Sequence, residues 1–140
     1  MASIFTKILA GEMPGHFIWK DEVCFAIMTI QPIRVGHVIV IPNAEVNHWD
    51  DVPPLSAAHL MQVSQQIAKA IKANVVCKRV GVMVVGIEVP HTHIHLMPID
   101  SIADMDFNKA KPMPQDELAA MAIKLRSSLL VAGHKSAQIL

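Results

Sequence analysis

Residues 91–97 read His-Thr-His-Ile-His-Leu-Met, and this alternation is the most informative feature of the 140-residue chain. Successive side chains of a β-strand point to opposite faces, so His91, His93 and His95 are expected to line one side. The Ile and Leu between and after them then face the other side, where they can join a core. On a helix each ring would lie about 200° around the axis from the next. The stretch therefore predicts a strand that carries three titratable rings on one surface.

Apolar runs on either side of this stretch indicate further strands, and apolar residues at helical spacing indicate helices. Asp21-Glu22 predicts a hairpin turn, and Pro53-Pro54 predicts the start of a long helix. A polar connection over 100–114 leads to a second long helix, which ends at Gly133. This order of elements predicts an α+β domain with a mainly antiparallel sheet. The expected strands are 16–20, 23–30, 35–42, 79–85 and the histidine stretch, and the expected helices are 4–11, 54–73 and 114–133.

Composition limits the classes of partner. Twelve Lys and Arg balance twelve Asp and Glu, and 52% of the residues are hydrophobic. We therefore expect one domain over residues 1–140 with a substantial core, and no nucleic-acid or membrane partner. The first eleven residues contain no long apolar run, so we expect no secretory leader. Cys24 and Cys77 form no closely spaced pair, which is typical of reduced thiols in a cytoplasmic protein.

The histidine row allows three interpretations. Packing alone gives no reason for three imidazoles on one face. A zinc site with three His ligands is a stronger alternative, yet the nearest carboxylates that would orient the rings, Glu88 and Asp100, lie just outside the motif. In the third interpretation a neutral imidazole attacks phosphorus, while its neighbours share protons and bind phosphoryl oxygens. A fourth ring for that chemistry is available at His37.

The motif resembles the signature of the histidine triad (HIT) family, His-φ-His-φ-His-φ-φ with φ hydrophobic, and Thr92 is a mild departure from it. The segment 4–14, with Ile4-Phe5-x-Lys7-Ile8 and Gly11-Glu12-Met13-Pro14, is also similar to that family. So is Pro32 together with the segment 36–42, which supplies His37. The resemblance implies a five-stranded, mainly antiparallel sheet with two main helices, one long and central and one C-terminal. It also implies a homodimer.

The same resemblance implies hydrolysis of a small purine nucleotide conjugate at its α-phosphate, either a phosphoramidate or a dinucleoside polyphosphate. By position, His93 resembles the nucleophile that forms a nucleotidyl-histidine intermediate. His91 and His37 resemble the pair that hydrogen-bond alongside it, and His95 resembles the ring that contacts the phosphate. The transferase branch of the superfamily carries Gln at the third triad position, so His95 favours hydrolysis. No cofactor is expected.

Substrate-binding positions follow from the same resemblance, with two departures. Phe5, Ile8 and Ile27 resemble the apolar wall around the base, although each would also serve as core. The ribose-binding Asp of the family falls at Thr29, whose hydroxyl cannot form the charge-assisted pair that a carboxylate gives. Glu88 stands where a Ser or Thr is common, and its charge would repel a phosphate. These departures keep an alternative open, namely a nucleotide-binding or interaction protein with little turnover.

Some bacterial relatives hold structural zinc through two N-terminal cysteines. Those positions are Ser3 and Thr6 in this chain, so we expect no bound metal of that kind.

Overall fold

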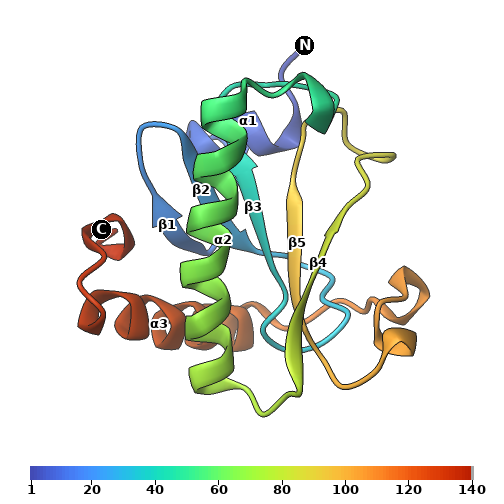
Figure 1. The fold of residues 1–140 in the computed structure, drawn as a ribbon, viewed down its shortest axis with the longest axis vertical. Coiled ribbons are helices and arrows are strands. Elements are labelled where there is room, and N and C mark those ends of the chain that lie inside the picture. Colours follow the sequence, from blue (N-terminus) through green and yellow to red (C-terminus); the bar gives the residue numbers. More distant parts are fainter. Residues whose placement is uncertain (140) are drawn as a thin grey trace.

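The computed structural model describes residues 1–139 and has a five-stranded antiparallel sheet as its centre (Figure 1). The strands follow the spatial order β1-β2-β3-β5-β4, so that β1 and β4 form the two edges. The strands are β1 (Phe17–Lys20), β2 (Cys24–Met28), β3 (Val38–Pro42), β4 (Arg79–Val84) and β5 (Ile94–Ile99).

The central strands are more deeply buried than the edge strands β1 and β4, which carry exposed residues. Every residue of β2 and β3 is buried, because other elements cover both faces of these strands. The β1–β2 hairpin is set by Asp21, whose Oδ1 accepts from the backbone N–H groups of Val23 and Cys24 at 2.8 Å. The predicted turn at Asp21-Glu22 is therefore present, with an Asx-type bond that fixes its shape.

Three helices complete the fold: α1 (Ile4–Leu9), α2 (Pro54–Asn74) and α3 (Gln115–Val131). The Ser3 side chain caps α1 by accepting from the backbone N–H of Thr6. Helix α2 starts with Pro54, whose missing N–H costs nothing in a first turn. Helix α3 carries Asp116 and Glu117 in its first turn, where negative charge complements the helix dipole. Short 3₁₀ turns occupy 49–51, 102–104, 107–109 and 135–137.

Helices α2 and α3 cover one face of the sheet, and α1 packs on the other (Figure 1). The α2–α3 side holds the main hydrophobic core, which includes Ile94 and Leu96 of β5. The α1 side holds a smaller cluster made of Phe5, Ile8, Phe25, Ile27, Ile39 and Ile41. The even-numbered side chains after the first triad histidine thus face the helices, as the alternation predicts. The predicted α+β class, the five-stranded sheet and the two main helices are confirmed.

Regular strand geometry covers only part of the histidine stretch. Strand β5 begins at Ile94, where its pairing with β3 (Val40) and with β4 (Val84) begins, so His91 and His93 lie just before it. The backbone N–H of Thr92 bonds instead to the carbonyl of Val46. No helix within residues 1–139 combines the length and the apolar character that crossing a bilayer requires.

Candidate active site

The His91 ring is held by hydrogen bonds at both of its nitrogens. The ring is fully buried, and its Nε2 lies 2.8 Å from the carbonyl oxygen of Pro42 at the end of β3. A carbonyl can only accept, so Nε2 carries the proton. On the other side of the ring Nδ1 lies 2.6 Å from Oγ of Ser3 and accepts from that hydroxyl. Both ring nitrogens are thus engaged, and His91 cannot rotate without breaking a buried hydrogen bond.

His93 has one ring nitrogen held and the other free. Its Nδ1 lies 2.7 Å from the backbone carbonyl of His91, which places the proton on Nδ1. Nε2 then carries a lone pair, and within residues 1–139 no protein group is hydrogen-bonded to it. The ring of Phe5 meets the His93 ring edge-on at 4.9 Å between centroids. Packing and one hydrogen bond therefore orient an imidazole whose basic nitrogen is available.

His37 and His95 form a second, connected pair. The backbone N–H of Ile33 donates to Nδ1 of His37 at 3.1 Å, so the proton of His37 lies on Nε2. That Nε2 donates to Nδ1 of His95 at 3.0 Å. The proton of His95 is therefore on its Nε2, which makes that atom a hydrogen-bond donor. The ring centroids of His93 and His95 lie 4.8 Å apart. The acceptor nitrogen of His93 and the donor nitrogen of His95 therefore belong to adjacent rings.

Burial keeps these imidazoles neutral. Desolvation, together with the nearby His93, lowers the pKa of His37 from 6.5 to about 4. Desolvation, followed by the charges of His93 and His37, lowers the pKa of His95 to about 3. The pKa of His93 is lowered as well, chiefly by desolvation, while the carboxylate of Glu88 acts in the opposite direction. At neutral pH the rings of His37, His93 and His95 are therefore uncharged.

Of the other residues predicted from the sequence, some pack on the same side of the sheet as these rings and others lie at the edge of the site. Phe5, Ile8 and Ile27 lie in the hydrophobic cluster on the α1 side, which is the side of the histidine rings, and all are buried. Thr29 follows β2, and its backbone N–H bonds to the carbonyl of His37. Glu88 is exposed in the loop that precedes the triad, and only its charge acts on His93. The structure thus brings the four histidines and Phe5 into contact, while Thr29 and Glu88 lie at the margin.

Three participants were not predicted as part of the site. Ser3 orients His91, and the carboxylate of Glu45 accepts from the backbone N–H of Ser3 (2.6 Å) and from the hydroxyl of Thr6 (2.7 Å). Phe107 lies edge-on to His95, with 4.9 Å between ring centroids. An aromatic residue inside the polar connection 100–114 was the one sequence signal for Phe107. Ser3 and Glu45 contact segments that are distant in the sequence, so no local sequence pattern indicates these contacts.

The geometry disfavours a zinc site made of the three triad histidines. Both ring nitrogens of His91 are already bonded to protein atoms, so neither offers a free lone pair. Within residues 1–139 the triad nitrogens also do not gather closely enough to surround one ion.

Comparisons with known proteins identify relatives of this chain. An uncharacterized HIT-like protein of Mycobacterium tuberculosis is 30% identical over 103 residues, which are 70% of this chain and 72% of that protein. The adenosine 5'-monophosphoramidase of Saccharomyces cerevisiae is 31% identical over 99 residues, which are 69% of this chain and 62% of the yeast enzyme. A zinc-bound histidine triad family protein from Mycobacterium smegmatis superimposes with a TM-score of 0.81 at 25% identity, covering 94% of this chain and 96% of the other.

A profile of a whole protein family also matches this chain, and this match does not depend on any single relative. The profile described as the HIT domain matches residues 10–102, a range that includes all four site histidines. That match spans well over half of the 140 residues. The chain belongs to the HIT domain family.

Proposed function

We propose that this protein hydrolyses a small nucleotide conjugate at its α-phosphate, with His93 as the nucleophile. The observation that carries the proposal is the hydrogen bond from Nδ1 of His93 to the carbonyl of His91, at 2.7 Å. This bond leaves Nε2 as an unprotonated nitrogen at the surface of an otherwise buried cluster. A neutral imidazole held in one orientation is a competent nucleophile near pH 7.

The reaction has two displacement steps. In the first, the Nε2 lone pair of His93 forms a bond to phosphorus, and the bond from phosphorus to the leaving group breaks with its electron pair going to that group, which takes up a proton from solvent. The His93 ring becomes cationic, and the carbonyl of His91 stabilises the charge through the Nδ1 proton. In the second step, water attacks phosphorus and gives up a proton to solvent, and the P–N bond breaks with its electron pair returning to Nε2 of His93. Nucleoside monophosphate is released and His93 returns to its neutral form.

In this proposal His95 binds the phosphoryl oxygens, and His37 holds His95 in the donor tautomer. The Nε2 proton of His95 is a donor because Nδ1 accepts from His37. A donor beside the nucleophile binds a phosphoryl oxygen as negative charge builds up in the transition state. His37 fixes that tautomer through the bond from the Ile33 backbone N–H.

The substrate class rests on the family and on one relative. The yeast relative is described as an adenosine 5'-monophosphoramidase, which supports a purine nucleotide with a phosphoramidate bond as the first compound to test. By the resemblance, Phe5, Ile8 and Ile27 would form the apolar wall around the base, and their common cluster beside the histidine rings supports this. At Thr29 a hydroxyl replaces the carboxylate that would bind ribose, so we expect weaker sugar binding than a carboxylate gives.

Rapid mixing with an adenosine phosphoramidate followed by intact-protein mass spectrometry tests the proposal. The expected result is an adenylyl adduct on wild-type protein that is absent in His93→Ala, with loss of turnover. His48→Ala is the matched control, because His48 is exposed and lies outside the cluster. Turnover that is unchanged in His93→Ala would refute the proposal. Nucleotide binding by calorimetry without any hydrolysis would instead support the binding-protein alternative.

The proposed enzyme is a homodimer that pairs through the β4 side of the sheet. Strand β4 is an edge, and exposed edges offer unpaired backbone groups to a second chain. Val82 and Val85 are exposed there, and Trp49 and Met61 nearby line an apolar hollow of about 300 Å³. Sedimentation equilibrium is expected to give twice the chain mass for wild type and the chain mass for Val82→Glu.

A further inference from the structure

A second cluster of metal-ligating side chains lies on the opposite face of the sheet from the histidine site. It joins Asp21 in the β1–β2 turn, Cys24 at the start of β2 and His59 on α2. One ligand atom from each lies within 4.8 Å of the other two. Cys24 belongs to the core between the sheet and the helices, whereas the triad rings face the α1 side.

The centre of the cluster is one carboxylate oxygen. Oδ2 of Asp21 lies 2.7 Å from Nε2 of His59, 2.7 Å from the indole nitrogen of Trp19 and 3.8 Å from Sγ of Cys24. The other oxygen, Oδ1, is already used by two backbone N–H groups of the turn. Three donors thus point at Oδ2, which has two lone pairs, and the thiol contact is the longest. The thiol proton is the surplus donor in this arrangement.

We propose that Asp21, Cys24 and His59 form a zinc site. A divalent ion would take the place of the Cys24 thiol proton. Its bonds to His59 and Asp21 would replace the hydrogen bond between these two residues. Oδ2 would then use one lone pair for the metal and keep the other for the Trp19 indole. In this exchange Zn²⁺ binds the thiolate, the carboxylate and Nε2 of a neutral imidazole; the thiol proton is released to solvent, and the His59 proton moves from Nε2 to Nδ1 of the same ring.

The chemistry of the donors favours zinc over harder ions. Thiolate and imidazole suit Zn²⁺, whereas Mg²⁺ and Ca²⁺ prefer oxygen ligands alone. Ligand bonds to zinc are about 2.0–2.3 Å long, so neighbouring ligand atoms lie roughly 3.2–3.8 Å apart. The Sγ–Oδ2 separation of 3.8 Å already agrees with that, and the 2.7 Å contact between His59 and Asp21 needs to open by about half an ångström.

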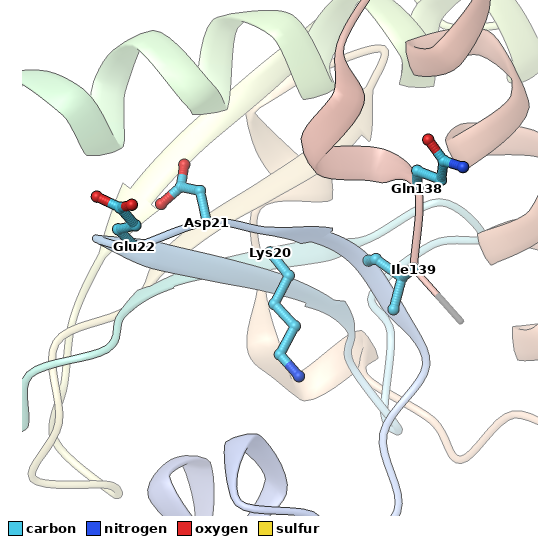
Figure 2. Close-up of a pocket in the computed structure, with 5 residues that line it drawn as sticks. All are labelled: Lys20, Asp21, Glu22, Gln138 and Ile139. Carbon is cyan, nitrogen blue, oxygen red and sulfur yellow. The ribbon is translucent and has the colours of Figure 1, made fainter.

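Water can reach the cluster to supply a fourth ligand. The side chain of His59 is 34% exposed and that of Asp21 is 16% exposed. Asp21 also lines an open hollow of about 540 Å³ with Lys20, Glu22, Gln138 and Ile139. Figure 2 shows the Asp21 carboxylate turned toward the helix side of the hairpin, while the Lys20 side chain points to the other side. The cation of Lys20 is therefore directed away from the proposed zinc.

The site would fasten the β1–β2 hairpin to α2 and take no part in the histidine chemistry. Cobalt titration of the metal-free chain tests it, because tetrahedral Co²⁺ bound to a thiolate gives a near-ultraviolet charge-transfer band. The expected result is such a band that saturates at one equivalent, disappears on addition of Zn²⁺ and is absent in Cys24→Ser. Cys77→Ser is the matched control, since Cys77 is the other free cysteine of the chain and lies outside the cluster. That variant must keep the band.

A second variant guards against misfolding of the buried Cys24→Ser. His59→Gln changes a partly exposed position on α2, and it is expected to weaken cobalt binding by more than about tenfold, because loss of a ligand exceeds the usual cost of an outer-shell change. Absence of the band in wild type, or a band that persists in Cys24→Ser, would overturn the proposal. Cobalt held only by the triad histidines gives no thiolate band and would count against it too.

Discussion

Oγ of Ser3 lies 2.6 Å from Nδ1 of His91, although 88 positions separate the two residues in the chain. The same Oγ accepts from the backbone N–H of Thr6 and so caps α1. One hydroxyl therefore starts a helix and holds a buried imidazole in place, while the carbonyl of Pro42 fixes the tautomer of that imidazole. Because the carbonyl of His91 in turn holds His93, the N-terminal segment is linked to the proposed nucleophile.

Replacing Ser3 with Ala should lower the free energy of unfolding by about 2 kcal/mol. The change removes a helix cap and leaves Nδ1 of His91 buried without a donor, and each loss costs about 1 kcal/mol or more. Urea unfolding measures the difference. Thr6→Ala is the control, because it removes the bond to the exposed carboxylate of Glu45 and a long contact of 3.4 Å with Oγ of Ser3, but keeps the backbone cap and the Ser3–His91 bond. Equal midpoints for Ser3→Ala and wild type would show that the Ser3–His91 bond does not contribute.

Acid should destabilise the fold through the histidine pair. The pKa of His37 is about 4 in the folded chain and 6.5 when unperturbed, so the unfolded chain binds more protons between these values. Stability is therefore expected to fall as the pH drops below 6.5, by about 2 kcal/mol for His37 alone between pH 6.5 and 4.5. His95, with a pKa of about 3, acts in the same direction.

Urea unfolding at a series of pH values measures this slope. His37→Gln should flatten the slope, whereas His48→Gln, at an exposed position, should leave it unchanged. A slope that is the same in wild type and in His37→Gln would mean that protonation of His37 is not coupled to folding.

Local patterns predicted most of the fold because each depends on near neighbours. Alternation placed Ile94 and Leu96 in the core, and Pro54 marked the start of α2. The beginning of β5 was not predictable, because it depends on where the distant strands β3 and β4 can still pair. Ser3 and Glu45 were not predicted as site residues for the same reason, because their hydrogen-bond partners lie far away in the chain. The three triad histidines were predicted because their spacing is local, whereas His37 was predicted from the resemblance of the segment 36–42 to the family.

Phe107 should control how far water reaches His95. Its ring lies edge-on to His95 at 4.9 Å between centroids, and desolvation is the main reason for the low pKa of His95. Phe107→Ala should therefore raise the pKa of His95 toward 6.5, as measured by NMR titration of the ring carbon protons. Phe107 is 42% exposed, so the variant is expected to fold. An unchanged titration of His95 would show that other residues keep water away from this ring.

Glu88 should make a small contribution to the acid limit of activity through its charge. Its carboxylate raises the pKa of His93, opposing the burial that lowers it. Glu88→Gln should therefore move the pKa of His93, and with it the acid limb of kcat/KM, to lower pH, because protonated His93 cannot attack phosphorus. Glu88 is exposed, so the shift should be smaller than about one pH unit and should shrink with added salt. Glu22→Gln, an exposed acid on the β1–β2 hairpin, should leave the profile in place. A shift of the acid limb toward higher pH in Glu88→Gln would contradict the electrostatic explanation. NMR titration of His93 in the absence of substrate would show whether the shift comes from ionisation of His93 or from substrate binding.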